Sequence, residues 1–392
     1  MRIAFAGRCA VKLALSCALL AGRIADGDDG FAPPPAVPQG WKLREVVRMP
    51  EKPTRITSDR AGRLYVLTLY GDVYRLDPGT GTLDRAIDRA AYLTQAGEYS
   101  CMGLCFDAQD RLYIVANYND ERARPQLNRA TIFRCDPQDL ANPKPWIETA
   151  YPFGIDVFNH GVGHIALGPD GFLYVNSGSR TDHGEAGTDP NRSAEGETPI
   201  TACIWRLDPR AAKPEIEIYA RGLRNAYGFC WDAHGRMIAT DNGPNENAPE
   251  ELNVVEHGKH YGFPYNFANL EKSPYPDTPP VPPGLQMTPP VATFDAHSSP
   301  AGVVYLGATF PPHARDSFLV VRFGNLLPVP PVGQDLLHVR FVDDHHAEVE
   351  PLITGLTRPA DVHITSGGRV FIVEVFRRQS ELPGRIWELS AE

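Results

Sequence analysis

The feature that most constrains the fold is a repeat that occurs six times along the 392-residue chain. Each copy holds a short apolar strand, a turn of the Asp-x-x-Gly or Pro-Asp-Gly kind, a strand such as "LYV", and a later segment such as "RLDP". The copies lie at 59–78, 107–137, 168–209, 232–255, 316–342 and 366–389. Four antiparallel strands per copy, at a period of about 40–70 residues, are typical of a propeller. We therefore predict an all-β fold, a six-bladed β-propeller of four-stranded antiparallel blades.

Composition supports this prediction and excludes some functions. The chain has 35 Gly and 37 Pro, yet 42% of its residues are hydrophobic, which indicates many turns around a real core. Lys and Arg number 38 against 48 Asp and Glu, a formal charge of −10. This acidic balance argues against nucleic acid as a partner. A G-x-G-x-x-G nicotinamide fingerprint and a C-x-x-C-H haem motif are both missing.

The N-terminus has the pattern of an export signal. Basic residues precede the apolar run "LALSCALLAG", which is too short to span a bilayer. We predict a signal peptide over about 1–25, a flexible leader over 26–40, and one catalytic propeller over 41–392. The signal leads us to expect a periplasmic or extracellular protein, and no later segment is apolar enough to form a membrane span. Five cysteines remain after the signal, and this odd number leaves at least one free thiol.

Polar, ionisable residues recur near the start of each expected inner strand. In a propeller these strands line the central channel, so we expect the six positions to meet at one end of it. They are Arg55, Glu98, His160, Arg224, His297 and Arg358. Three arginines in a chain of net negative charge indicate a cationic pocket for a small polyanion beside a titratable imidazole. The alternative is ordinary solvation and salt bridging at a channel mouth.

Three segments in the middle of the chain carry a family resemblance: "GLRNAYGF" (222–229), "DNGPNENAPEELN" (241–253) and "GKHYGFPY" (258–265). They resemble the soluble quinoprotein sugar dehydrogenases, a superfamily that includes soluble glucose, aldose sugar and L-sorbosone dehydrogenase-like proteins. "NHGVGHIALGPDGFLYVNSGS" (159–179) is similar to the family segment with the catalytic histidine. The resemblance runs from about residue 41 to the C-terminus. It implies a six-bladed propeller that holds pyrroloquinoline quinone (PQQ) and Ca²⁺ at the channel mouth.

The resemblance also implies roles for single residues. Ca²⁺ would bind the backbone carbonyls of Gly243 and Pro244, which are hard oxygen ligands of the kind it prefers. His160 would take the hydroxyl proton of a sugar or polyol as hydride leaves for PQQ, with Arg224 against the quinone oxygens and Asn225 fixing the site. The remaining candidates for cofactor binding are Arg55, Glu98, His297, Arg322 and Arg358. Glu250 and Glu251 match an acidic pair of the family that either holds a second Ca²⁺ or solvates the loop.

Three positions depart from the family pattern. Asn159 and Ser179 replace aspartates, so Asp182 becomes the candidate to orient His160, and Glu98 replaces a glutamine. We predict a secreted quinoprotein oxidoreductase, a PQQ- and Ca²⁺-dependent sugar dehydrogenase that passes electrons to a separate acceptor. The departures leave open a non-catalytic propeller that binds glycan or protein. A Ca²⁺-dependent lactonase-type hydrolase is a second alternative, which the Arg- and His-rich strand starts disfavour.

Overall fold

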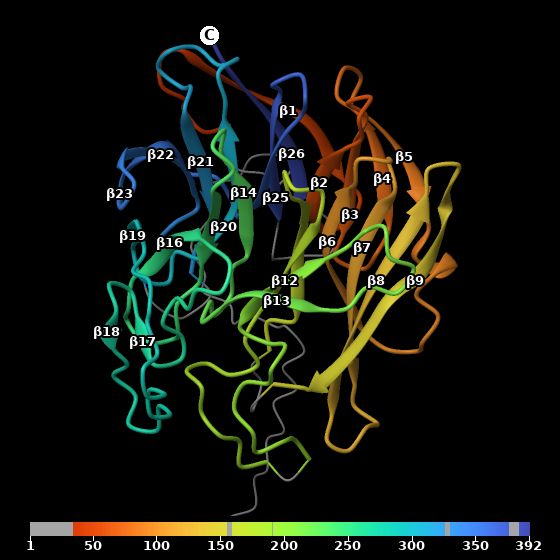
Figure 1. Ribbon diagram of the computed structural model, residues 1–392. Helices are drawn as coiled ribbons and strands as arrows, with labels where there is room; N and C mark the ends of the chain where they lie inside the picture. The colour runs from red at the N-terminus through yellow and green to blue at the C-terminus, as the bar shows by residue number, and fades with distance from the viewer. Residues whose placement is uncertain (1–33, 155–158, 190, 326–329, 376–383) are drawn as a thin grey trace, which may run out of the picture.

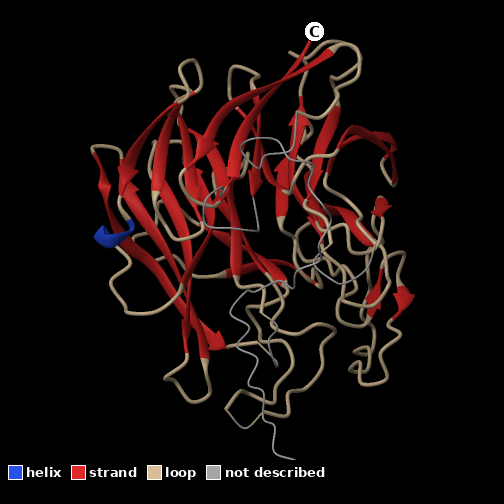
Figure 2. Cartoon of the chain, turned by 180° about the vertical axis from the view of Figure 1, so that it is seen from behind, coloured by secondary structure: helices blue, strands red, loops and turns tan. Residues whose placement is uncertain are grey.

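The strands form six four-stranded antiparallel sheets arranged as blades around a ring (Figures 1 and 2). The computed structural model describes residues 34–154, 159–189, 191–325, 330–375 and 384–392. This architecture confirms the predicted six-bladed propeller. The predicted signal peptide, 1–25, lies outside the described residues, as does most of the leader. In the part of the chain that the structure describes, no helix is long and apolar enough to cross a bilayer.

The blades follow one another along the chain, each from an inner to an outer strand. The first three blades are β2–β5 (Pro53–Ser58, Leu64–Thr68, Val73–Asp77, Thr82–Ile87), β6–β9 (Tyr99–Phe106, Leu112–Asp120, Leu127–Asp136, Asp139–Pro152) and β10–β13 (Val162–Leu167, Leu173–Ser177, Cys203–Leu207, Glu217–Arg221). The next two are β14, β15, β16 and β19 (Gly228–Trp231, Met237–Asp241, Glu250–Val255, Ala292–Phe294) and β20–β23 (Pro300–Leu306, Ser317–Arg322, Asp335–Asp343, His346–Thr354). Outside the blades lie a 3₁₀ turn, η1 (Arg89–Ala91), and a hairpin, β17 (Asn266–Phe267) with β18 (Glu271–Lys272).

The last blade is completed by the start of the chain. Strands β24 (Pro359–Ile364), β25 (Val370–Val375) and β26 (Gly384–Ala391) receive β1 (Trp41–Met49) as their outer strand. Strand β1 pairs antiparallel with β26, from Trp41 opposite Ala391 to Met49 opposite Gly384, and Figure 1 shows the two side by side. Hydrogen bonds between the two ends of the chain therefore close the ring.

Glycines let the inner strands pack closely around the channel. Strands β2, β6, β10, β14, β20 and β24 contact one another in turn around the ring. A Cβ on Gly103 of β6 would lie 2.4 Å from the carbonyl oxygen of Gly163 in β10. A Cβ on Gly302 of β20 would lie 2.6 Å from the amide nitrogen of Val362 in β24. Both distances are far below van der Waals contact, so these positions exclude any side chain.

The repeated Asp-x-x-x-Arg motif has a local structural cause. In three blades the aspartate after the inner strand accepts a hydrogen bond from the backbone N–H of the arginine four residues later, and a second from that arginine's Nε. The pairs are Asp59 with Arg63, Asp107 with Arg111, and Asp232 with Arg236. Each aspartate side chain thus accepts from a backbone N–H of the tight turn, a donor that has no partner within the strands.

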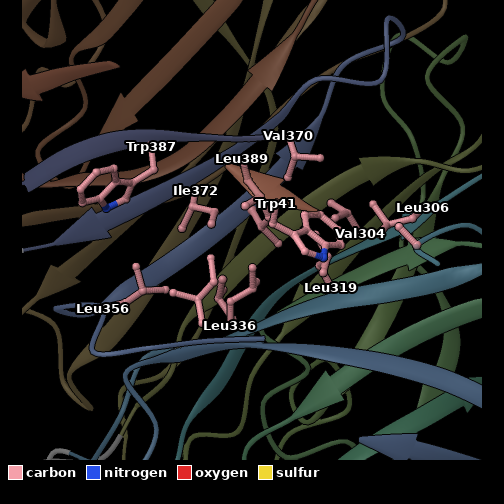
Figure 3. Packing of buried hydrophobic residues seen from close by; sticks show 14 of the residues in the cluster. Trp41, Val304, Leu306, Leu319, Leu336, Leu356, Val370, Ile372, Trp387 and Leu389 are labelled. Atoms are coloured by element: carbon pink, nitrogen blue, oxygen red, sulfur yellow. The ribbon is translucent and has the colours of Figure 1, made fainter. Parts of the chain in front are cut away.

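Apolar side chains fill the space between neighbouring blades. The largest such cluster joins the last two blades and β1, with Trp41, Trp387, Ile372 and Leu319 among its members (Figure 3). Trp387 is fully buried and Trp41 is 6% exposed. Burial of one such side chain stabilises the fold by about 1.5–3 kcal/mol. The core therefore lies between the blades, and the channel mouth is left to polar residues.

All five cysteines of the propeller are free thiols: Cys101, Cys105, Cys135, Cys203 and Cys230. Four of them are buried, and burial raises the pKa of Cys101 to about 12. The prediction of at least one free thiol is confirmed.

Candidate functional site at the channel mouth

His160 lies two residues before β10 and is held by the main chain. Its Nδ1 is 3.1 Å from the Ser179 carbonyl oxygen and 3.0 Å from the Ser179 hydroxyl. A carbonyl oxygen can only accept, so Nδ1 carries the proton and Nε2 keeps its lone pair. The Ser179 hydroxyl donates to the Thr181 carbonyl, which leaves its oxygen to accept as well. A backbone carbonyl and a hydroxyl thus orient His160 in place of the expected carboxylate.

Arg224 meets His160 across the mouth. Its NH1 lies 3.4 Å from His160 Nε2, and it donates to the Asn242 carbonyl at 3.1 Å. Arg224 also donates through NH2 to Asp182 Oδ1 at 2.7 Å and through Nε to the Asp182 carbonyl at 2.8 Å. Asp182, the candidate to orient His160, is therefore the partner of Arg224. The structure brings His160 and Arg224 together as the sequence predicted.

Asp241 explains why "LRN" and "DNGP" occur as a pair. It is the last residue of β15, and its carboxylate accepts from the Arg224 backbone N–H at 2.9 Å and from the Asn225 N–H at 2.6 Å. The Asn225 side chain accepts from Asn176 Nδ2 at 3.2 Å. A buried carboxylate at the end of one strand therefore fixes the turn that presents Arg224. The candidate metal turn at Gly243 begins two residues later.

The environment keeps His160 neutral. Burial, together with the nearby positive charge of Arg224, lowers the pKa of His160 to about 3. A neutral imidazole whose Nε2 is unprotonated can accept a proton, which is what a general base requires.

The turn at Gly243 and Pro244 presents main-chain oxygen atoms. Among the described residues, neither carbonyl accepts a hydrogen bond. The Gly243 N–H donates to Glu250 Oε2 at 2.5 Å, and Ser299 N donates to Glu250 Oε1 at 3.3 Å. Glu250 and Glu251 are 4% and 6% exposed, so the pair does not solvate the loop. Burial raises the pKa of Glu250 to about 7 and raises that of Glu251 as well.

Two predicted cofactor ligands are enclosed by partners of their own. Arg55 was expected just upstream of its strand, but it is the third residue of β2 and is 1% exposed. It donates to Asp361 Oδ1, to the Met102 carbonyl and to the Tyr227 carbonyl, so it joins four blades. Arg322 is held by Asp335 at 2.9 and 2.6 Å and by Asp295 at 2.7 Å. Their role in cofactor binding stays a prediction.

Three other predicted residues keep more freedom. Arg358 directly precedes β24 and is partly buried; it donates to the Asn325 carbonyl at 3.1 Å. Burial lowers its pKa, and no carboxylate pairs with it within the described part of the chain. His297 is also partly buried, with φ of 64°, two residues before the Ser299 N–H that binds Glu250. Glu98 is exposed just before β6.

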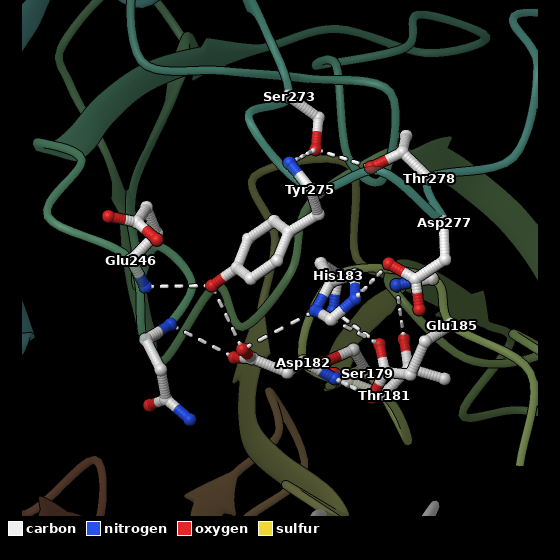
Figure 4. Close-up of polar contacts among 12 residues, drawn as sticks. Ser179, Thr181, Asp182, His183, Glu185, Glu246, Ser273, Tyr275, Asp277 and Thr278 are labelled. Atoms are coloured by element: carbon white, nitrogen blue, oxygen red, sulfur yellow. Dashed lines mark hydrogen bonds and ion pairs between the residues drawn. The ribbon is translucent and has the colours of Figure 1, made fainter.

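Sequence reasoning missed a polar cluster beside Arg224 (Figure 4). Asp182 Oδ2 accepts from the Tyr275 hydroxyl at 3.1 Å, and the His183 ring stacks on Tyr275 with centroids 3.7 Å apart. His183 Nε2 lies 2.9 Å from Asp277 Oδ1, and Glu185 accepts from the Asp182 backbone N–H at 2.8 Å. The signal was the polar run "SRTDHGE" at 179–185, but its partners lie about 90 residues away in the chain.

Solved structures share this fold. The PQQ-bound aldose sugar dehydrogenase of Streptomyces coelicolor superposes with a TM-score of 0.64 at 20% identity, covering 91% of this chain and 100% of that one. A calcium structure of a carbohydrate-active enzyme of family AA12 from Trichoderma reesei superposes at 0.62 with 18% identity, covering 91% and 97%. An uncharacterized protein of Borreliella burgdorferi is 24% identical over 310 residues, which are 76% of this chain and 74% of that protein. These structural similarities show that the chain shares the propeller fold of these proteins.

The family itself is identified by sequence. The family model described as "Glucose / Sorbosone dehydrogenase" matches residues 44–382, which is most of the chain. The chain belongs to this family, and its membership supports an oxidoreductase of the sugar dehydrogenase type.

Proposed function

We propose that this protein is a PQQ- and Ca²⁺-dependent dehydrogenase that oxidises a hydroxyl of a sugar or related polyol. The observation that carries the proposal is the neutral His160, with its Nε2 lone pair 3.4 Å from the guanidinium of Arg224. The similarity to a PQQ-bound aldose sugar dehydrogenase supports the choice of quinone.

The residues at the mouth fit the proposed groups. PQQ is a tricarboxylate, and Arg358 is a partly buried cation for which the described residues supply no carboxylate. The Gly243 and Pro244 carbonyls are oxygen donors that accept no hydrogen bond within the described residues, and Ca²⁺ prefers such hard oxygens. The described residues hold no group of three His, Cys, Asp or Glu side chains arranged for a metal. Metal binding here would therefore rest on main-chain carbonyls.

The chemistry of the chain follows from these positions. Bound PQQ supplies the two-electron oxidant, and Ca²⁺ would polarise its carbonyl as a Lewis acid. Nε2 of His160 takes the proton of the substrate hydroxyl, while Nδ1–H stays on the Ser179 carbonyl and keeps the ring oriented. Arg224 stabilises negative charge beside the reacting atoms. An anion against Arg224 would offset its charge and raise the pKa of His160 from about 3, which would make the imidazole a stronger base.

Reconstitution tests the proposal. Apo-protein is titrated with PQQ in the presence and absence of Ca²⁺ by calorimetry, and dye reduction is then measured over a panel of sugars and polyols. We expect micromolar or tighter PQQ binding that a chelator weakens, and turnover with at least one sugar. No PQQ binding at micromolar concentration would refute the dehydrogenase and favour the alternative of a glycan- or protein-binding propeller.

We further propose that the protein is exported, with cleavage of a signal peptide near residue 25, and that a separate protein or small molecule accepts its electrons. The support for export is the basic, then apolar N-terminal pattern. N-terminal sequencing of the protein from periplasmic and culture fractions tests this, and an uncleaved N-terminus would contradict it.

A further inference from the structure

A single carboxylate connects four loops at the channel mouth. Asp182 lies in the connection from β11 to β12 and is 9% exposed. Its Oδ1 accepts from Arg224 NH2 at 2.7 Å and from the Asn245 backbone N–H at 3.0 Å. Its Oδ2 accepts from the Tyr275 hydroxyl at 3.1 Å (Figure 4). Arg224, Asn245 and Tyr275 come from three different connections between strands. All three therefore bind one side chain of a fourth connection.

These contacts fix the orientation of the Arg224 guanidinium and the position of the turn with the Gly243 and Pro244 carbonyls. The Asp182 carboxylate and carbonyl together hold two nitrogens of the Arg224 guanidinium, which leaves NH1 directed at His160 Nε2. The Asn245 N–H lies one residue after Pro244, so the same carboxylate holds the turn with the candidate metal carbonyls. Tyr275 extends this hold, because its hydroxyl also accepts from the Glu246 N–H at 2.7 Å.

We propose that Asp182 is a positioning residue that sets both the Arg224 guanidinium and the Gly243–Asn245 turn, so that the base and the metal ligands face one substrate. The proposal rests on the proposed function for its effect on turnover, but not for its effect on the turn. Asp182 does not act as the base, because its two oxygens already accept hydrogen bonds from Arg224, Asn245 and Tyr275.

The first experiment needs no cofactor. Amide hydrogen exchange over residues 243–248 is compared in apo wild type, Asp182→Ala and the control Asp277→Ala. Asp277 contacts His183 in the same cluster but is 60% exposed and does not contact Arg224. We expect exchange of this turn to rise at least tenfold in Asp182→Ala and to stay unchanged in Asp277→Ala. Equal protection in all three proteins would overturn the proposal, whether or not the protein binds PQQ.

The second experiment separates positioning from folding. Asp182→Asn keeps an acceptor oxygen and the size of the side chain but removes the charge. We expect its PQQ dissociation constant to stay within about threefold of wild type, because the loss of a nearby carboxylate does not weaken binding of an anion. We expect kcat to fall by about 10²-fold, since small misplacements of catalytic groups have effects of this size. A kcat within twofold of wild type, or a parallel loss of PQQ affinity and melting temperature, would overturn the positioning role.

Tyr275→Phe tests whether Tyr275, the other side chain bound to this turn, has the positioning role instead. Tyr275→Phe removes one hydroxyl, so we expect faster exchange at Glu246 with kcat reduced less than in Asp182→Asn. If Tyr275→Phe lowers kcat more than Asp182→Asn does, Tyr275 is the residue that positions the site, and the assignment to Asp182 is wrong. If wild type fails to bind PQQ, the proposed function fails, and the exchange experiment still decides whether Asp182 holds the turn.

Discussion

His160→Ala is the substitution that most directly tests the site. At pH 7 the wild-type imidazole is neutral, since burial and Arg224 lower its pKa to about 3, so Nε2 is unprotonated in nearly every molecule. Loss of a general base lowers the rate by about 10²–10⁴-fold, or about 3–5.5 kcal/mol in the barrier. PQQ should stay bound, because Arg224 keeps its hydrogen bonds to Asp182 and to the Asn242 carbonyl when His160 is removed.

The assay is single-turnover dye reduction with PQQ-loaded protein, with bound PQQ measured by its absorbance. His164→Ala is the matched control: it lies in the same segment, in β10, where its Nε2 contacts the Phe229 carbonyl at 3.1 Å. We expect His164→Ala to lower stability but to keep kcat near wild type. Ser179→Ala should also keep most activity, because the Ser179 carbonyl still orients His160. Near-wild-type turnover in His160→Ala together with loss in His164→Ala would show that the catalytic assignment is wrong.

Three further predictions concern charge, pH and packing. Arg224→Ala should weaken PQQ binding and lower kcat together, because its charge serves both; calorimetry and dye reduction measure this, and a change in only one would contradict it. Burial lowers the pKa of His363 to about 4, so its stabilising contribution is full above pH 6.5 and is lost as the pH falls toward 4. Between pH 7 and pH 5 wild type should therefore lose about 2 kcal/mol more unfolding free energy than His363→Gln in urea titrations, and equal losses would refute this. Gly302→Ala should fail to fold or melt far lower, because its Cβ would lie 2.6 Å from the Val362 amide nitrogen; an unchanged melting temperature would contradict this close approach.

The fold was predictable because it repeats. A tight turn between two apolar strands recurs along the chain, with an aspartate at the turn in several blades, and six copies of this local pattern suffice to indicate the ring. The closing strand was not predictable in this way. Strand β1 carries no copy of the repeat, and its partner β26 lies more than 300 residues away, so only the unpaired edge of the last blade selects it.

The site was predictable in its motifs and less so in its contacts. The "LRN" and "DNGP" segments do meet, since Asp241 binds the backbone of both Arg224 and Asn225. Arg55 shows the limit of the pattern: an arginine at a strand start looks the same in sequence whether it faces a ligand or an aspartate. Only the three-dimensional pairing with Asp361 shows that its charge is already compensated.

The substitution at position 179 bears on whether this propeller is an enzyme. A serine in place of an orienting aspartate left open, in sequence, a propeller that has lost its chemistry. The structure removes that argument, because the acceptor that holds His160 Nδ1 is a main-chain carbonyl, which every residue at position 179 would supply. The serine hydroxyl adds only a second acceptor, at 3.0 Å from His160 Nδ1. A carbonyl carries no full charge, so its hydrogen bond to Nδ1 raises the pKa of the imidazole less than a carboxylate would. The cost of the substitution is thus basicity and not orientation, and it is the kind of loss that a bound anion against Arg224 offsets.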